Sequence, residues 1–227
     1  MPAVTTTPRQ SDVIPHELAD ALRGRFLVFD GPDGSGKSTQ HKRFIAAARA
    51  AGVPTVEVRE PGGTEVGERI RRALLDHLER DEMSLRCEML LYMASRAQLC
   101  EQVIRPALRE NRLVVADRFI SSTLVYQGHA GGIPIAEIEA AGRIATQGVS
   151  PDVTLIFDVD QRTAASRLNP LLDRMESKGA DFHARVRAGY KALIGQGGAY
   201  RRVDARGEPD EVFANILDTL RAALLAA

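Results

Sequence analysis

The chain has 227 residues, of which 44% are hydrophobic and 26% are charged, the balance of a globular protein with a proper core. Basic and acidic residues each number 30, so the net charge is zero and no overall basic field indicates a nucleic-acid or membrane partner. No run approaches the roughly 20 apolar residues of a membrane span, and a cytoplasmic location is expected.

Residues 1–22 are predicted to form an extension outside the fold. The segment lacks the apolar stretch of a secretory signal, and Asp12, Glu17 and Asp20 argue against an acid-poor transit peptide. One arginine and three threonines keep the transit-peptide interpretation open. Residues 23–227 are predicted to form a single domain.

The first predicted element is the apolar run "FLVFD", Phe26–Asp30, which is typical of a buried parallel strand. A glycine-rich segment follows, and few helix breakers occur between Ser38 and Ala50. This strand, loop and helix surround the pattern G-x-x-x-x-G-K-[ST], which favours a phosphate-binding loop over a chance match. The predicted ATP-binding residues are Gly31, Pro32, Asp33, Gly34, Ser35, Gly36, Lys37, Ser38 and Thr39.

Short apolar runs alternate with longer helical segments along the rest of the chain. Further strands are predicted at Thr55–Glu60, Leu113–Asp117, Val153–Val159 and Tyr200–Ala205. Helices are predicted around Val66, Ile70 and Leu74, over Arg86–Arg109, where Pro106 can bend the helix, and over Pro209–Ala226. This alternation predicts an α/β fold: a doubly wound parallel sheet of about five strands, with helices on both faces. Both cysteines, Cys87 and Cys100, fall in one predicted helix and are interpreted as reduced packing residues.

Two polar motifs follow predicted strands and should meet at the carboxyl edge of the sheet, where ligands of such folds bind. Asp117 closes one strand and is a candidate for holding Mg²⁺, while Arg118 can supply a bidentate phosphate contact. The aspartate could equally cap a turn. "REPGGT", Arg59–Thr64, permits a tight turn close to a ligand, although a simple strand-to-helix turn is the alternative.

Five segments now carry a family resemblance: "GPDGSGKST", "REPGGT", "YMASR", "DRFISSTLVYQG" and "LDRME". They occur in the order and at about the spacing of thymidylate kinases, so residues 25–225 resemble a bacterial member of that family. The pairing of REPGGT with DR-x₃-ST-x₂-YQG is far more specific than the phosphate loop. The resemblance implies transfer of the γ-phosphoryl group of ATP to dTMP, with Mg²⁺ and in a homodimer.

The resemblance also implies an acceptor site. Asp33 would contact the 3′-hydroxyl of the sugar, Tyr92 would stack on thymine, Arg96 would donate to its O4, and Tyr126 would crowd any 2′-hydroxyl. Without the matching motif, Tyr92 in the core and Arg96 in solvent would be the simpler interpretation. The predicted dTMP-binding residues are Asp33, Arg59, Glu60, Tyr92, Arg96, Arg118, Thr123, Tyr126 and Gln127.

The predicted lid covers residues 166–172, "SRLNPLL", and contains one arginine. Family members carry a stabilising arginine either in the phosphate loop, where this chain has Gly34, or in the lid. The resemblance therefore implies a lid arginine, and Arg167 is the predicted one, with Arg162 and Arg174 as rivals. The predicted catalytic residues are Lys37, Arg118 and Arg167.

Mg²⁺ is the predicted cofactor. Its predicted ligands are Ser38 and Asp117 and, by resemblance, Glu176 in the "DR-x-E" motif, for which an exposed helix face is the alternative. Two other functions stay open: a small P-loop kinase acting on a different nucleotide or a small alcohol, and a regulatory switch that hydrolyses nucleotides. The switch lacks support, because the chain has no [NT]-K-x-D guanine signature and its arginines would lack an acceptor.

Overall fold

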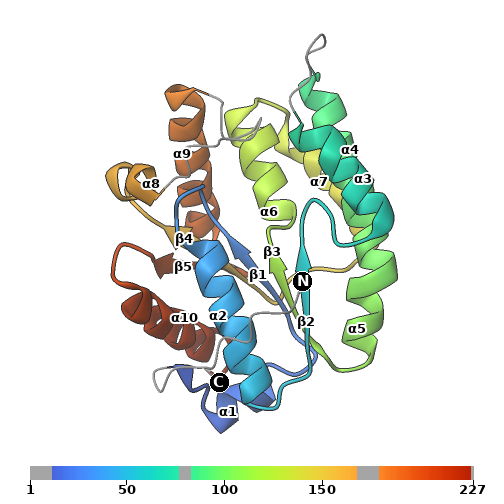
Figure 1. Ribbon diagram of the computed structural model, residues 1–227. Helices are drawn as coiled ribbons and strands as arrows, with labels where there is room; N and C mark the ends of the chain where they lie inside the picture. The colour runs from blue at the N-terminus through green and yellow to red at the C-terminus, as the bar shows by residue number, and fades with distance from the viewer. Residues whose placement is uncertain (1–11, 77–82, 168–178, 226–227) are drawn as a thin grey trace.

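The computed structural model describes residues 12–76, 83–167 and 179–225. Within them, one sheet has the strand order β2-β3-β1-β4-β5, and every pairing is parallel (Figure 1). The strands are β1 (Phe26–Asp30), β2 (Thr55–Arg59), β3 (Leu113–Asp117), β4 (Val153–Asp158) and β5 (Tyr200–Asp204). Each lies within its predicted range, so the predicted doubly wound α/β fold is confirmed.

The helices are α1 (His16–Ala21), α2 (Lys37–Ala50), α3 (Glu65–Leu75), α4 (Leu85–Leu99), α5 (Arg105–Arg109), α6 (Ile120–Thr123), α7 (Ile135–Thr146), α8 (Gln161–Arg167), α9 (Ala180–Gln196) and α10 (Pro209–Leu224). Two π-helical segments join them, η2 (Cys100–Ile104) and η3 (Leu124–Ala130). The predicted helix over residues 86–109 is therefore one run of α4, η2 and α5. The wider η2 turn precedes Pro106, whose ring cannot fit a regular α-helix interior and which lies in the first turn of α5.

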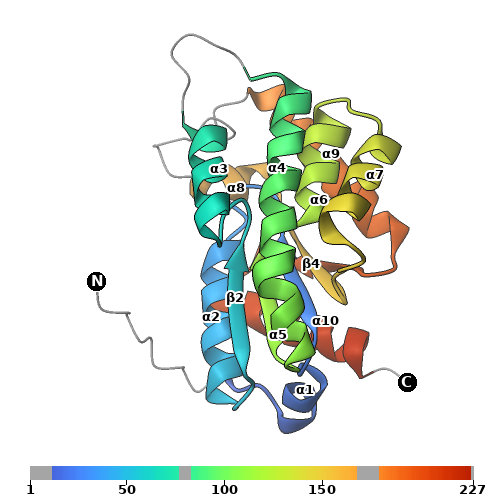
Figure 2. The same cartoon turned by 90° about the vertical axis from the view of Figure 1, so that its right-hand side faces the viewer.

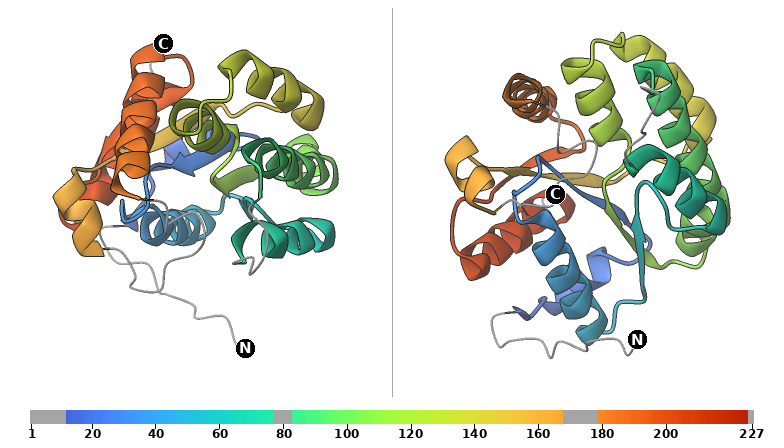
Figure 3. Two further views of the ribbon diagram at one scale, coloured as in Figure 1. Left: turned by 90° about the horizontal axis from the view of Figure 1, so that it is seen from above. Right: turned by 45° about the horizontal axis from the view of Figure 1, so that its top comes forward.

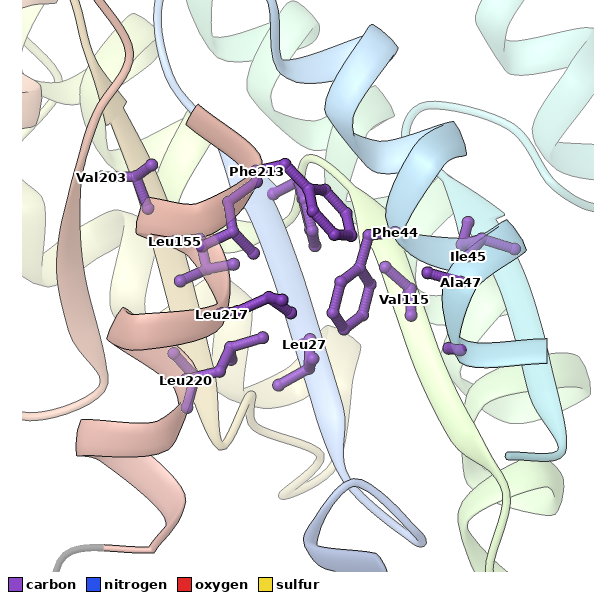
Figure 4. Close-up of a cluster of buried hydrophobic side chains, with 14 of the residues drawn as sticks. Leu27, Phe44, Ile45, Ala47, Val115, Leu155, Val203, Phe213, Leu217 and Leu220 are labelled. Atoms are coloured by element: carbon purple, nitrogen blue, oxygen red, sulfur yellow. The ribbon is translucent and has the colours of Figure 1, made fainter. Parts of the chain in front are cut away.

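Side chains alternate between the two faces of the sheet, and a separate helical layer covers each face. Leu27 and Phe29 of β1 pack with α1, α2 and α10, and Figure 4 shows Leu27 between Phe44 of α2 and Leu217 of α10. Phe26 of β1 faces the opposite way, toward η2 and α5. α2 and α9 accordingly lie on opposite sides of the sheet (Figure 3). This two-sided burial explains why the strands read as unbroken apolar runs.

Residues 12–22 belong to the fold, which corrects the prediction of an extension ending at residue 22. Leu18 and Leu22 are completely buried in the core beneath α10, together with Ile14. Asp12 accepts a hydrogen bond from Arg43 Nε at 2.9 Å. The spacing of four residues between the buried aliphatic residues is a helical signal that the sequence analysis missed. Residues 1–11 lie outside the described residues.

The two cysteines differ in their surroundings. Cys100 is buried, and burial raises the pKa of its thiol to about 12. Cys87 is exposed, so the interpretation as a packing residue is wrong for Cys87. Across the residues that the structure describes, none of the helices combines the length and the apolar character needed to cross a membrane.

Candidate active site

The carboxyl ends of the three strands on one side of the sheet bring the predicted residues together. The register pairs Arg59 with Asp117 across β2 and β3, and Phe29 with Asp117 across β1 and β3. β2 is one of the two edge strands of this sheet, and its carboxyl end leads to α3 (Figure 2). A cleft of about 370 Å³ opens there, within the size range of small-molecule sites.

Every residue of the predicted dTMP-binding set lines this cleft, together with Lys37, Ser38 and Asp117. A second cavity of similar volume lies between β4 and α9, and its lining is mostly apolar. Of the predicted site residues, that cavity contains only Pro32. The polar cleft is therefore the candidate site.

The phosphate-binding loop connects β1 to α2 and relies on glycine for its shape. Gly34 and Gly36 have φ angles of +75° and +82°, in the left-handed region, and Gly36 caps α2. A Cβ on Gly34 would lie 2.2 Å from the carbonyl oxygen of Ala164, so no side chain fits at this position. The loop thus aims the first N–H groups of α2 at the space where phosphates bind in such loops.

Lys37 and Asp117 face each other at the base of the cleft. Lys37 Nζ lies 3.8 Å from Asp117 Oδ1, and the lysine is almost completely buried. Burial lowers the pKa of Lys37, as does the neighbouring Arg118, while Asp117 opposes both. For Asp117, burial raises the pKa, but Lys37 and Arg118 outweigh burial and hold the pKa below its usual value.

The residues at this point fit a magnesium ion. Ser38 Oγ donates to Asp117 Oδ2 at 3.3 Å, whereas buried Asp117 Oδ1 has no hydrogen-bond partner among the described residues. A hydroxyl and one carboxylate are hard oxygen donors, and Mg²⁺ commonly completes its shell with water and substrate phosphates. Within residues 12–76, 83–167 and 179–225, no three acidic, cysteine or histidine side chains lie together so that they could hold a metal ion. Glu176, the third predicted ligand, lies outside the described residues.

Arg118 is held by a buried network that the sequence analysis did not predict. Its backbone has φ +70°, a strained value for arginine, and its Nη1 contacts Asp30 Oδ1 at 3.3 Å. Asp30 is completely buried and also accepts from the Tyr190 hydroxyl at 2.6 Å and Ser122 Oγ at 2.8 Å. The sequence offered one signal for this network, the carboxylate of Asp30 at the end of an apolar strand. Nothing in the sequence indicated that Tyr190 takes part.

Among the predicted dTMP-binding residues in the cleft, Arg96 is paired within the protein. It is 1% exposed, and its Nε and Nη2 donate to Glu60 Oε2 at 2.9 and 2.6 Å. Nη2 also donates to Thr123 Oγ1 at 3.1 Å. Burial raises the pKa of Glu60 to about 7, against the opposing effect of Arg96. The guanidinium therefore reaches the cleft wall in a fixed orientation.

Asp33 and Tyr126 form the part of the wall next to the phosphate loop. Tyr126 OH donates to Asp33 Oδ2 at 2.9 Å, and Arg118 Nη2 donates to Asp33 Oδ1. Burial raises the pKa of Asp33. The nearby charges, chiefly Arg118 and Lys37, lower it by more in total, so the pKa lies below its usual value. Arg59 lies on the exposed rim, where it pairs with Glu68 at 2.8 Å.

Deeper in the cleft, Gln127 Nε2 donates to Glu88 Oε1 at 2.7 Å, and both side chains are 1% exposed. The sequence analysis named Gln127 but not Glu88. Glu88 precedes Tyr92 by four residues and Arg96 by eight, so it shares their face of α4, and that spacing was the signal that could have found it.

Arg167 lies on the other side of the phosphate loop. Its Nη1 donates to the carbonyl oxygen of Ala205 at 3.0 Å and its Nη2 to that of Gly207 at 3.4 Å. Nη1 is also 3.7 Å from where a Cβ on Gly36 would lie. Arg162 is exposed on the same helix. The rival Arg174 and the rest of the predicted lid, residues 168–172, lie outside the described residues.

The parallel sheet, the glycine loop before α2 and the cleft define a nucleotide-binding P-loop protein of the kinase class. The family model described as "Thymidylate kinase" matches residues 29–216. The thymidylate kinase of Pelotomaculum thermopropionicum is 44% identical over 206 residues, covering 89% of this chain and 94% of that protein. The thymidylate kinase of Finegoldia magna is 40% identical over 198 residues, covering 86% and 97%.

Among solved structures, the thymidylate kinase from Ehrlichia chaffeensis matches with a TM-score of 0.70 and 27% identity. That match covers 88% of this chain and 99% of the other. The chain belongs to the thymidylate kinase family.

Proposed function

We propose that the chain transfers the γ-phosphoryl group of ATP to dTMP, giving ADP and dTDP. The observation that carries the proposal is the shared cleft: the phosphate-loop residues Lys37 and Ser38 line the same cavity as Tyr92, Arg96 and the other acceptor residues. An oxygen of the dTMP phosphate attacks the γ-phosphorus, and the bond to the bridging oxygen of ADP breaks. Such transfer needs positioning and charge neutralisation more than proton chemistry.

Two cations of this chain meet the charge of the phosphates. Lys37 lies at the start of α2, where it contacts the terminal phosphates of ATP. Arg118, fixed by Asp30 and Asp33, contacts the acceptor phosphate through its fork of N–H groups. Because Lys37 is buried and Arg118 is half-buried, their electrostatic effect on the transferred group is larger than it would be in solvent.

Mg²⁺ is the proposed cofactor, and Ser38 and Asp117 would hold it. When bound, the ion neutralises charge on the phosphate oxygens of ATP. Buried Asp117 Oδ1 accepts no hydrogen bond from the described residues and has only the 3.8 Å ion pair with Lys37 among them, which supports this assignment. Arg167 is the proposed lid arginine, and its position beside Gly36 of the phosphate loop supports this proposal.

We also propose a homodimer and a cytoplasmic location. Val66 on α3, Leu90 on α4 and Ile144 on α7 are exposed, and these three helices are neighbours, with α4 packed between the other two. Exposed apolar side chains mark a surface that a partner covers where they form a contiguous patch, and we propose that these three do so. Both cysteines are free thiols, in keeping with a reducing compartment. Light scattering of the parent and of Leu90→Glu tests the dimer.

Another small P-loop kinase with a different acceptor is not favoured, because the matching family model and the similar curated relatives are thymidylate kinases. A coupled ADP-release assay with Mg²⁺-ATP and dTMP, dUMP, dGMP, dCMP or no acceptor tests the proposal. We expect the fastest turnover with dTMP. Equal ADP release without an acceptor would indicate a nucleotide hydrolase instead, and a clear preference for another monophosphate would indicate a different kinase.

A further inference from the structure

Glu88 is a buried carboxylate that the proposed reaction does not use. It lies on α4, one helical turn before Tyr92 and two before Arg96, and only 1% of it is exposed. A buried carboxylate is costly unless it is hydrogen-bonded. Gln127 Nε2 supplies such a bond at 2.7 Å, across 39 residues of sequence. The two side chains therefore determine each other's position.

This bond fixes the direction of the Gln127 amide. A carboxylate only accepts hydrogen bonds, so the amide must turn its NH₂ group toward Glu88. The usual ambiguity between the oxygen and nitrogen of a glutamine side chain is removed by that requirement. Gln127 also lines the cleft, and the carbonyl Oε1 is the group that it can offer to a ligand there.

A donor lies along the same wall. Arg96 Nη2 bonds to Thr123 Oγ1 at 3.1 Å, and Thr123 precedes Gln127 by four residues on the helical run of α6 and η3. Glu60 fixes the guanidinium on its other side. Glu60 and Thr123 use both hydrogens of Nη2, and Nη1 donates to Met93 Sδ at 3.2 Å, so the second Nη1 hydrogen is the donor that Arg96 can present to the cleft. The cleft thus offers this donor together with the acceptor from Gln127.

We propose that Glu88 is a positioning residue for base selectivity, which holds Gln127 so that its carbonyl accepts from N3–H of the acceptor base beside the Arg96 donor. This inference rests on the proposed function. A pyrimidine-2,4-dione has an N3–H donor next to the O4 acceptor, and this edge matches the wall. Cytosine has an N3 acceptor next to an N4 amine, which places like groups against each other. Thymine and uracil share the matching edge, so Glu88 does not distinguish them.

The test is the ratio of kcat/KM for dTMP to that for dCMP, measured in the parent and in Glu88→Gln. An amide at position 88 can donate or accept, so Gln127 is free to turn over. We expect the preference for dTMP over dCMP to fall about 10- to 100-fold. The change should come mainly from KM, and the dTMP to dUMP ratio should stay constant. An unchanged preference in a variant that melts like the parent overturns the inference.

Two further variants separate positioning from a merely structural role. Glu101→Gln changes an exposed glutamate that pairs with Arg105, and should leave every ratio unchanged. The double variant Glu88→Gln/Gln127→Glu reverses the bond: the amide at position 88 donates to the carboxylate at position 127, whose second oxygen still accepts. It should regain the preference for dTMP, which also provides the test if Glu88→Gln does not fold. A double variant without the preference contradicts the inference, and a parent without dTMP turnover contradicts the proposed function itself.

Discussion

The two sides of the cleft are built differently. The ATP side is made of consecutive residues, 31–37, whose glycines shape a loop that presents backbone N–H groups. The acceptor side is made of side chains that are distant in sequence and bonded to one another. Arg96 pairs with Glu60, 36 residues away, and Gln127 with Glu88, 39 residues away.

The difference follows from what each side must recognise. Phosphates are the same in every nucleoside triphosphate, so a backbone loop suffices to bind them. A base is distinguished by its donors and acceptors, which only oriented side chains can match. Buried pairs hold these side chains in place before the ligand arrives, which reduces the cost of binding. Substitutions on the ATP side should therefore change rate, and those on the acceptor side should change binding and stability together.

The largest expected effect is that of Lys37→Ala. Removing the cation at the start of α2 should lower kcat by at least about 10³-fold, because the charge on the transferred phosphoryl group loses a preorganised partner. The melting temperature should stay close to that of the parent, since the ion pair of Lys37 with Asp117 is long, at 3.8 Å. Steady-state kinetics and thermal melting measure the two quantities. A variant that melts normally and keeps more than a tenth of kcat would contradict the assignment.

Arg167→Ala should come next, with kcat lowered about 10²- to 10³-fold and little change in either KM. The guanidinium now bonds to the Ala205 and Gly207 carbonyl groups, which it would release to reach the phosphoryl group. Arg162→Ala, on the exposed face of the same helix, is the matched control and should be nearly silent. If Arg167→Ala keeps the parental rate at saturating ATP, Arg174 becomes the leading candidate. Gly34→Arg cannot restore the lost cation, because a side chain there collides with Ala164.

Arg96→Ala should weaken dTMP binding by about 1–3 kcal/mol and leave ATP affinity unchanged. It should also destabilise the protein, because Glu60 loses its partner, by up to about 3–5 kcal/mol. Calorimetric titration with each nucleotide measures the first effect and urea unfolding the second. Equal losses of affinity for ATP and dTMP would indicate general damage instead.

The loss of stability in Arg96→Ala should depend on pH. Burial raises the pKa of Glu60 to about 7, and removing Arg96 raises that pKa further. At pH 6 Glu60 is largely protonated in both the parent and Arg96→Ala, so losing the positive charge of Arg96 matters little. At pH 8.5 the parent has an ionised, paired Glu60, while the variant must bury that charge unpaired or keep a proton. The loss of stability should therefore be larger at pH 8.5 than at pH 6, and a pH-independent loss would argue against an ion pair.

The smallest effect concerns Tyr126. Tyr126→Phe removes one hydrogen bond to Asp33, worth about 0.5–1.5 kcal/mol, and should keep the preference for deoxyribose because the ring does the excluding. Tyr126→Ala should relax that preference. Turnover of dTMP and of the corresponding ribonucleotide measures it. Unaltered discrimination in the alanine variant would remove Tyr126 from the sugar site.

The sequence predicted the ATP side well because its signals are local. Five strands, the glycine loop and the start of α2 follow from apolar runs and a pattern within a few residues. The residues of the acceptor side were predicted through family motifs. The hydrogen-bonded pairs among them and with Glu88 were not predicted. One partner of Asp30 is Tyr190, 160 residues away, and no periodicity reports such a contact. α1 was missed although its buried residues repeat at helical spacing, because a helix this short is stable only through packing, here against α10.

The hydrogen bonds just beyond the strands have a consequence for divergence. Glu60 N donates to the carbonyl oxygen of Asp117 at 3.0 Å, and Arg118 N donates to that of Phe29 at 3.0 Å. These main-chain bonds set the spacing between the donor and acceptor halves, independently of the side chains on α4 and η3. A new acceptor base can therefore be accommodated by exchanging a few helix side chains, while the separation of the two phosphate positions is inherited unchanged.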